Sequence, residues 1–314
     1  MTAVVCRAVA RLSSGVNKST HPSAGGLALG AGAYALWGVL PLYFHLLTDV
    51  PALQVLAHRI VWSVLLLVAI VLFLRRGRAL LAAARGRTLI YLVASAALIA
   101  VNWLVYIWAV QNHHVLEGSL GYFINPLVNV ALGVAVLGER LRPVQAGAIG
   151  VAAAGVLVLA ASGGGALWIS LVLAFSFALY GLVRKIAHID SLGGLTIETL
   201  ILLPFALVAL GLAARSGTLA FGVHRDQDTL LLIAGIVTTV PLLMFAAAAK
   251  RMPYATLGLL QFIAPTLQFA SAVFFGEAVR PIHYLTFGLI WTGCALYAAD
   301  TVRAARAASV MRPD

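Results

Sequence analysis

Ten apolar stretches, each close to the length of a membrane-spanning helix, dominate this sequence. A helix needs about 20 apolar residues to cross the hydrocarbon core of a bilayer. Because 62% of the residues are hydrophobic and only 10% are charged, the chain exceeds the roughly 45–50% apolar content of soluble domains. The sequence therefore predicts an all-α polytopic membrane protein with ten transmembrane helices. The predicted segments are 25–47, 52–74, 88–110, 116–137, 143–161, 166–184, 192–213, 229–249, 255–275 and 281–300.

The positions of the basic residues predict how these helices are oriented. Cytoplasmic connections of membrane proteins carry an excess of Lys and Arg. If the N-terminus is cytoplasmic, 17 of the 21 basic residues fall on the cytoplasmic side, three fall outside, and Arg59 lies within a helix. We therefore expect a multi-pass protein of the cell (inner) membrane with both termini in the cytoplasm. The connections are short, and only the one from 214 to 228 has room for ordered structure.

The two halves of the chain repeat a pattern. The motif Gly-Glu-x-x-Arg-Pro occurs at 138–143 and again at 276–281, and Pro126 is matched by Pro265, 139 residues later. Five helices per half is an odd number, so the halves would insert in opposite orientations, as in transporters built from inverted repeats. The predicted units are a cytoplasmic tail (1–24), a first five-helix repeat (25–161), a second five-helix repeat (166–300) and a cytoplasmic tail (301–314).

Prolines and polar residues interrupt the fourth and ninth segments. A proline inside a helix removes one backbone hydrogen bond, and in lipid the freed carbonyl needs a partner on a neighbouring helix. Paired interruptions in corresponding helices indicate a transport site near the bilayer midplane. The alternative is a packing kink held by a hydrogen bond of Asn125. The residues predicted to form this mid-membrane floor are Tyr122, Asn125, Pro126, Gln261 and Pro265.

Arg59 is the costliest residue to bury, because it lies about 10 Å along the second helix at 1.5 Å per residue. An arginine at a helix centre costs about 2.5–3.5 kcal/mol on insertion scales. We therefore expect it to line a cavity, where it binds an anionic group or locks a gate with Glu117. The alternatives are that Arg59 extends to the outer headgroups and that Glu117 only stabilises the positive end of its own helix.

Glu198 is the leading candidate for proton coupling, and Glu117 is the second. Glu198 lies 139 residues after Arg59, so the two halves would place opposite charges at matched depths. Burial favours the neutral form of a carboxyl, which suits proton coupling; the alternative is a structural hydrogen bond to a neighbouring helix. Glu139 and Glu277 end their helices beside arginines, where we expect a solvated cap or an interfacial ion pair.

Aromatic and amide side chains are candidates to line the cavity, although many aromatic residues only mark membrane interfaces. The pair His113-His114 lies in a short outer connection without a cluster of Cys, His and acids of metal-site spacing, so we expect no metal site and no cofactor. The residues predicted to contact substrate are Arg59, Tyr34, Trp37, Asn102, Trp103, Tyr122, Asn125 and Gln261.

The expected partners are a small-molecule substrate and membrane lipid. The net charge of +11 lies in membrane-flanking segments, so it does not indicate nucleic-acid binding. The small residues Ala146, Gly150 and Ala154 form one face of the fifth helix. Such a face allows close helix packing, either inside the protein or in a homodimer.

Several stretches resemble one known family. They include AYALWGVLPLYF, LAHRIVWS, NWLVYIWAV, HHVLEGSLGYFINPLVN, LGERLRP and LGLLQFIAPTLQF. From about Gly25 to Asp300 the chain is similar to the RarD-type branch of the EamA group, in the drug/metabolite transporter superfamily. The resemblance implies ten helices in two inverted repeats and a secondary transporter, in prokaryotes an exporter. In one departure, Gln54 stands where the family often has an acid.

These features predict a transporter, not an enzyme. It would move small organic solutes such as amino acids or amphipathic drugs by alternating access, either proton-linked or facilitated. A membrane enzyme would need clustered His, Asp or Ser at one interface, and the ten acids are spread along the chain. A channel would need a polar-lined path, and a regulatory scaffold would show no flux.

Overall fold

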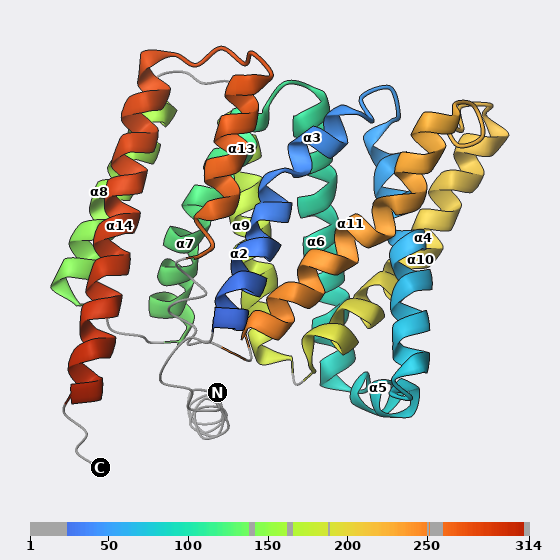
Figure 1. The fold of residues 1–314 in the computed structure, drawn as a ribbon, viewed down its shortest axis with the longest axis horizontal. Coiled ribbons are helices and arrows are strands. Elements are labelled where there is room, and N and C mark those ends of the chain that lie inside the picture. The colour runs from blue at the N-terminus through green and yellow to red at the C-terminus, as the bar shows by residue number, and fades with distance from the viewer. Residues whose placement is uncertain are drawn as a thin grey trace.

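The computed structural model describes residues 24–137, 142–161, 166–187, 189–249, 251 and 260–310. Within these ranges every regular element is a helix (Figure 1). Glu139, the residues before 24 and the start of the predicted ninth segment lie outside them. The helices are α2 (Ala24–Gly38), α3 (Leu40–His45), α4 (Ala52–Phe73), α5 (Gly77–Ala83), α6 (Arg87–Gln111), α7 (Val115–Leu137), α8 (Pro143–Ala161), α9 (Leu167–Ile186), α10 (Ser191–Arg215), α11 (Arg225–Ala249), α13 (Ile263–Phe274) and α14 (Pro281–Val310).

The helix bounds follow the apolar segments closely, with three differences. The first segment is split into α2 and α3, and Pro41 lies in the first turn of α3, where a proline needs no backbone donor. The short helix α5 forms in the connection from 75 to 87, where no ordered structure was expected. Finally, α14 continues to Val310, so the start of the predicted C-terminal tail is helical.

The length and composition of the helices agree with a membrane protein. Among the described residues, six helical segments are long and apolar enough to cross a bilayer, and α13 and the start of α8 are shorter apolar helices. In lipid a helix satisfies all its internal backbone hydrogen bonds within the segment. The predicted all-helical, polytopic membrane class is confirmed.

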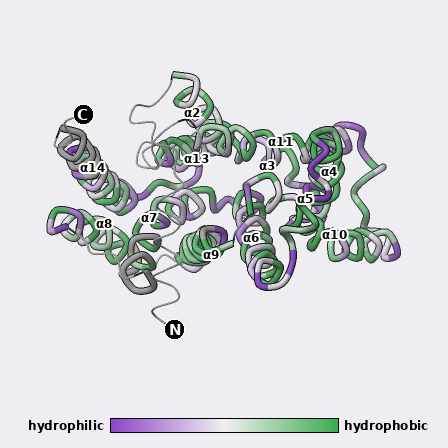
Figure 2. Tube along the Cα trace, turned by 90° about the horizontal axis from the view of Figure 1, so that it is seen from below, coloured by the Kyte–Doolittle hydropathy of each residue, from purple (hydrophilic) through white to green (hydrophobic). Residues whose placement is uncertain are grey.

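The helices form two layers, which Figure 2 shows end-on. One layer contains α14, α13, α2, α11 and α4, and the other contains α8, α7, α9, α6 and α10. Within the layers, α2 packs against α11 and α13, and α9 packs against α6 and α7. Across the layers, α14 packs on α8, α13 on α7, and α4 on α10. Each layer therefore mixes helices from both halves of the chain.

Small residues permit the closest helix contacts. A Cβ atom added to Gly121 of α7 would lie 2.8 Å from the carbonyl oxygen of Ser170 and 2.9 Å from Cβ of Leu173, both on α9. Backbones approach this closely in membrane proteins only where the side chain is small. By contrast, Ala146, Gly150 and Ala154 are exposed on α8, so this small-residue face makes no internal contact.

Gly121→Ala should destabilise the protein by about 1–3 kcal/mol, because overpacking forces α7 and α9 apart. Cys294 is only 6% exposed, so a thiol-reactive dye reports unfolding in a Cys6→Ser background. We expect a lower unfolding temperature for Gly121→Ala than for the control Gly147→Ala, whose added methyl group would meet no atom within 4 Å. Equal unfolding temperatures would show that the two helices can separate without cost.

Candidate functional site

Arg59 is buried between the two layers, with a relative exposure of 4%. Its Nε donates a hydrogen bond to Oγ1 of Thr238 on α11, at 2.8 Å. Its guanidinium carbon lies 4.6 Å from the ring centroid of Trp103 and 5.3 Å from that of Phe44. Such contacts with aromatic faces stabilise a desolvated cation. Arg59 thus points into the bundle and does not extend to the headgroups.

No carboxylate of the described chain lies within ion-pair distance of Arg59. Glu117, one of the partners considered from sequence, instead lies 3.5 Å from Nδ1 of His114. Glu117 is in the first turn of α7, at the end of the bundle, whereas Arg59 lies two turns inside α4 and turns toward α11. The expected gate between Arg59 and Glu117 is therefore absent from this conformation.

Three tyrosines lie near Arg59: Tyr43, Tyr106 and Tyr122. The Tyr43 hydroxyl donates to the carbonyl of Leu230 at 2.8 Å, and the Tyr122 hydroxyl donates to Oδ1 of Asn102 at 3.1 Å. The hydroxyl of Tyr106 is buried, with no hydrogen-bond partner among the described residues. The surroundings of Arg59 are therefore aromatic, and one polar group there is unsatisfied.

Asn102 connects three helices. Its Nδ2 donates to the carbonyl of Leu173 and to Oγ of Ser176, both at 3.0 Å, while Oδ1 accepts from Tyr122. These bonds join α6 to α9 and α7. The amide expected to contact substrate is thus used for interhelical hydrogen bonds in this conformation.

The remaining predicted site residues lie apart from Arg59. Tyr34 and Trp37 form an aromatic cluster with Phe245, with ring centroids 5.4–5.9 Å apart. Asn125 is buried in α7, and Gln261 is half-buried in the turn before α13. The guanidinium itself contacts Thr238, Trp103 and Phe44. The structure therefore separates the predicted site into an Arg59 region and a region near α2 and α13.

The two expected helix breaks differ from each other. Helix α7 continues through Pro126 without interruption. Pro265 lies in the first turn of α13, and its carbonyl accepts a hydrogen bond from Oγ of Ser119 on α7 at 2.7 Å. A helix tolerates proline in its first turn, and Pro265 lies in the first turn of α13, directly after the turn at 261–262.

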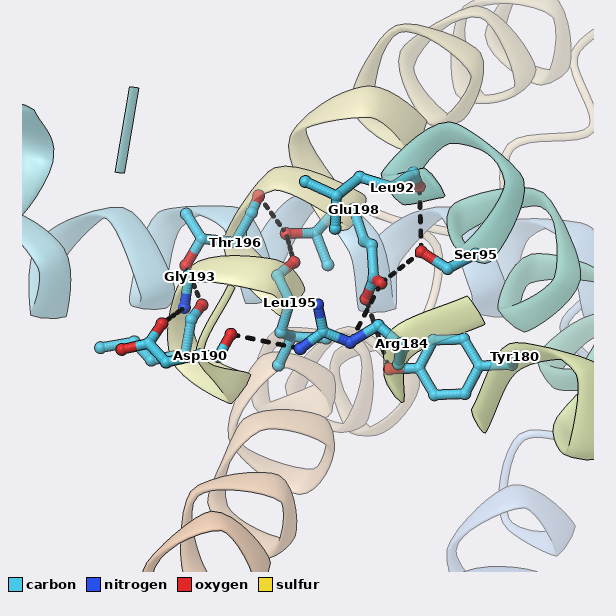
Figure 3. A network of polar contacts seen from close by, with 11 residues as sticks. Leu92, Ser95, Tyr180, Arg184, Asp190, Gly193, Leu195, Thr196 and Glu198 are labelled. Atoms are coloured by element: carbon cyan, nitrogen blue, oxygen red, sulfur yellow. Dashed lines mark hydrogen bonds and ion pairs between the residues drawn. The ribbon is translucent and has the colours of Figure 1, made fainter. Parts of the chain in front are cut away.

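Glu198 is fully buried and belongs to a network of polar contacts (Figure 3). Its carboxylate accepts a hydrogen bond from Oγ of Ser95 at 2.5 Å and from the Tyr180 hydroxyl at 3.4 Å. Nε of Arg184 lies 3.5 Å from Glu198 Oε1, and Arg184 Nη2 donates to the carbonyl of Asp190 at 3.2 Å. Glu198 is therefore neutralised by a cation from α9 and held by side chains of α6 and α9.

The sequence did not indicate Arg184 as the partner of Glu198, because Arg184 was counted only among the basic residues on the cytoplasmic side. The short connection between α9 and α10 could have indicated this pair, since it keeps the adjoining helix ends close. The network extends to the surface at this end of the bundle, where Arg76, beside α5, forms an ion pair with the Asp190 carboxylate at 2.9 Å.

Gln54 fastens the connection between α10 and α11 to α4. Its Nε2 donates to the carbonyl of Thr218 at 2.8 Å, and its Oε1 accepts from the backbone N–H of Ala220 at 2.9 Å. A carboxylate at this position could accept from Ala220 but could not donate to Thr218. The amide that departs from the family pattern therefore makes two bonds in this chain, one of which an acid could not make.

Glu277 connects the two halves at the end of the bundle opposite α5. Gly276, with φ of +75°, ends α13 in the left-handed conformation that favours glycine. The next residue, Glu277, accepts hydrogen bonds from the backbone N–H groups of Val115 and Leu116, at 2.7 and 2.8 Å. The Gly-Glu motif thus caps the N-terminus of α7, a helix in the other half of the chain.

A two-layered bundle of apolar helices that encloses a guanidinium and a neutralised carboxylate is the architecture of a polytopic membrane transporter. The model of the EamA-like transporter family matches residues 24–161. Protein RarD of Streptomyces exfoliatus is 47% identical, over 92% of this chain and 93% of that one. An uncharacterized transporter, YojE, of Bacillus subtilis is 40% identical, over 88% and 94%.

This chain belongs to the EamA-like transporter family, in its RarD-type branch within the drug/metabolite transporter superfamily. The assignment makes it a membrane transporter and not an enzyme. One solved crystal structure shares the fold, with a TM-score of 0.61 and 19% identity over 87% of this chain and 96% of that one.

The stability of the protein should depend on pH through Glu277. Burial raises the pKa of this carboxyl, the N–H groups of Leu116 and Val115 lower it, and the nearby Glu117 raises it further. The net pKa is raised, so this contribution to stability is present at low pH and lost as pH rises through that pKa. Between about pH 4 and about pH 8, the unfolding temperature of the wild type should fall relative to Glu277→Gln, which cannot ionise.

Asp49→Asn is the control, because Asp49 is an exposed acid at the same end of the bundle. Its pH profile should follow that of the wild type. If the wild type instead gains stability over Glu277→Gln as pH rises, the hydrogen bonds to α7 outweigh burial and the predicted sign is wrong.

Proposed function

We propose that this protein is a secondary transporter that moves small organic solutes by alternating access, with export as its direction. Two buried charges at equivalent positions carry the proposal. Arg59 and Glu198 each lie seven residues beyond the first residue of their helices, Ala52 of α4 and Ser191 of α10. These two helices pack against each other, and both side chains contact α6, Arg59 at Trp103 and Glu198 at Ser95. Ionisable residues inside a membrane are costly and usually functional.

The proposed architecture is ten transmembrane helices in two inverted five-helix repeats. The packing supports it, because α8 packs on α14, α7 on α13 and α4 on α10. Each of these pairs joins a helix to its counterpart in the other half. The remaining contacts follow the same correspondence. In the first half α2 packs against α11 and α13, and its counterpart α9 packs against their counterparts α6 and α7. A two-fold axis in the membrane plane produces this pattern, and rocking of the repeats about it alternates access.

Glu198 is the proposed site of proton coupling. Its carboxylate contacts Arg184, Ser95 and Tyr180. Protonation would remove its negative charge and weaken the attraction to Arg184, which would loosen the contact between α9 and α10. Loss of this contact would open the bundle at the end where α5 lies. Glu117 lies beside His114 at the opposite end and is the second candidate.

We place this protein in the cell (inner) membrane with both termini in the cytoplasm. The α5 end carries Arg76 and Arg184, and basic residues concentrate on the cytoplasmic side of membrane proteins. The Glu198 network would then close the cytoplasmic side, and the Glu277 cap would close the outer side.

Transport should depend on both buried charges. In liposomes on a solid-supported membrane, we would record currents for amino acids, organic acids and amphipathic antibiotics, with and without a pH gradient. Glu198→Gln should lower gradient-driven transport about tenfold or more, the effect of about 1.4 kcal/mol on an equilibrium, because it cannot exchange a proton. Arg59→Ala should lower transport at every pH, while the control Asp49→Asn should match the wild type.

Three outcomes would contradict the proposal. If Arg59→Ala and Glu198→Gln both leave transport unchanged, the site is elsewhere. If the protein conducts without saturation and without dependence on a gradient, it is a channel, and if no solute moves in radiolabel exchange, a scaffold role replaces transport.

A further inference from the structure

The charge of Arg59 is not neutralised within the described protein. A guanidinium has five N–H donors, and the only hydrogen bond that Arg59 makes to a described residue runs from Nε to Thr238. Thr238 itself donates to the carbonyl of Ala234 at 2.8 Å, so its one O–H group is already used. A buried cation without a counter-charge carries a large desolvation cost. An anion bound beside it would offset that cost.

Tyr106 supplies a second unused donor at the same place. The residue is 3% exposed, and its hydroxyl has no hydrogen-bond partner among the described residues. Its ring lies 6.0 Å from that of Phe44 and 5.4 Å from that of Tyr122, and the Phe44 ring also contacts the Arg59 guanidinium at 5.3 Å. Arg59 and Tyr106 therefore adjoin the same phenyl ring, and both offer N–H or O–H donors.

The same surroundings disfavour a cation. No carboxylate of the described residues lies within ion-pair distance of Arg59, and Glu198 is engaged by Arg184. Aromatic faces could bind an ammonium group, but the faces of Phe44 and Trp103 already contact the guanidinium. An ammonium group would also be repelled by Arg59 in a medium of low dielectric.

We propose that the solute binds at this place as an organic carboxylate with an aromatic or aliphatic body and no ammonium group. Arg59 and the Tyr106 hydroxyl donate hydrogen bonds to the carboxylate, and the neighbouring rings of Tyr106 and Tyr122 contact the body. This inference rests on the proposed transport function and narrows its substrate class from organic solutes in general to monoanionic acids. It makes Tyr106 a specificity-determining residue that the sequence analysis left out of the site.

The test compares three ligands that share one body and differ in charge. They are 3-phenylpropionate, an anion; phenylalanine, a zwitterion; and phenethylamine, a cation. Binding to the purified protein in lipid nanodiscs would be measured by isothermal titration calorimetry. We expect 3-phenylpropionate to bind, phenylalanine to bind at least about tenfold more weakly, and phenethylamine not to bind. One uncompensated charge weakens binding by at least this factor.

Variants assign the effect to particular groups. Arg59→Gln should weaken binding of 3-phenylpropionate about 10- to 100-fold, the range for a hydrogen bond to a charged group, and Tyr106→Phe about 3- to 10-fold. Tyr284→Phe is the matched control for Tyr106→Phe, because it removes a hydroxyl from an exposed tyrosine on α14 and should leave binding unchanged. In the Cys6→Ser background, a variant is folded if its Cys294 reacts with the thiol dye only on heating.

The outcomes separate this inference from the proposed function. The inference is overturned if the folded wild type does not bind 3-phenylpropionate. It is also overturned if phenylalanine binds as tightly as 3-phenylpropionate and this binding depends on Arg59. Binding of 3-phenylpropionate with no flux in liposomes supports the anion site and contradicts transport of this solute class. Flux of other solutes that is unaffected by Arg59→Gln supports transport and overturns the anion site.

Discussion

The hydrocarbon core of a bilayer contains no hydrogen-bond partner for an exposed peptide group, and this constraint governs the whole molecule. Backbone groups must be paired within each segment, so the spans are helices. Polar side chains must then find partners on neighbouring helices, both within a layer and across the two layers. Asn102 joins three helices in this way, and Ser119 joins α7 to α13. The polar contacts between helices therefore define where the halves meet.

The two buried charges are treated differently by the fold. Glu198 has a cation from α9 and two hydroxyl donors around it, so its charge is compensated within the protein. Arg59 has aromatic faces and one hydroxyl, but no carboxylate among the described residues. A compensated charge suits a contact that forms and breaks as the halves move. An uncompensated charge suits a site that is completed by a ligand.

The connections between helices contribute to the coupling of the halves. Gln54 on α4 holds the backbone between α10 and α11, and Glu277, beside α14, holds the start of α7. Both side chains bind backbone groups of the opposite half of the chain. Movement of one half relative to the other must therefore break or carry these bonds, which makes the ends of the bundle part of the conformational change.

The sequence by itself determined the helices. Apolar length and short polar connections set where α4, α6, α8 and α10 begin and end, because these depend on local hydrophobicity. The offset of 139 residues also matched Arg59 with Glu198, which occupy the same position in α4 and α10. Recognition of the family followed from motifs spread over most of the chain.

Only the tertiary structure decided which side chains meet. From the sequence, Glu117 was one possible partner of Arg59, but helix α7 places Glu117 beside His114 and Glu277. The sequence placed Arg184 only among the basic residues at the cytoplasmic side, although that residue neutralises Glu198. It grouped Tyr34, Trp37 and Gln261 with Arg59, but the packing of α2 against α11 and α13 separates them. The physical reason is that hydrophobicity specifies a helix locally, whereas a polar partner depends on the rotation and depth of a second helix that is distant in sequence.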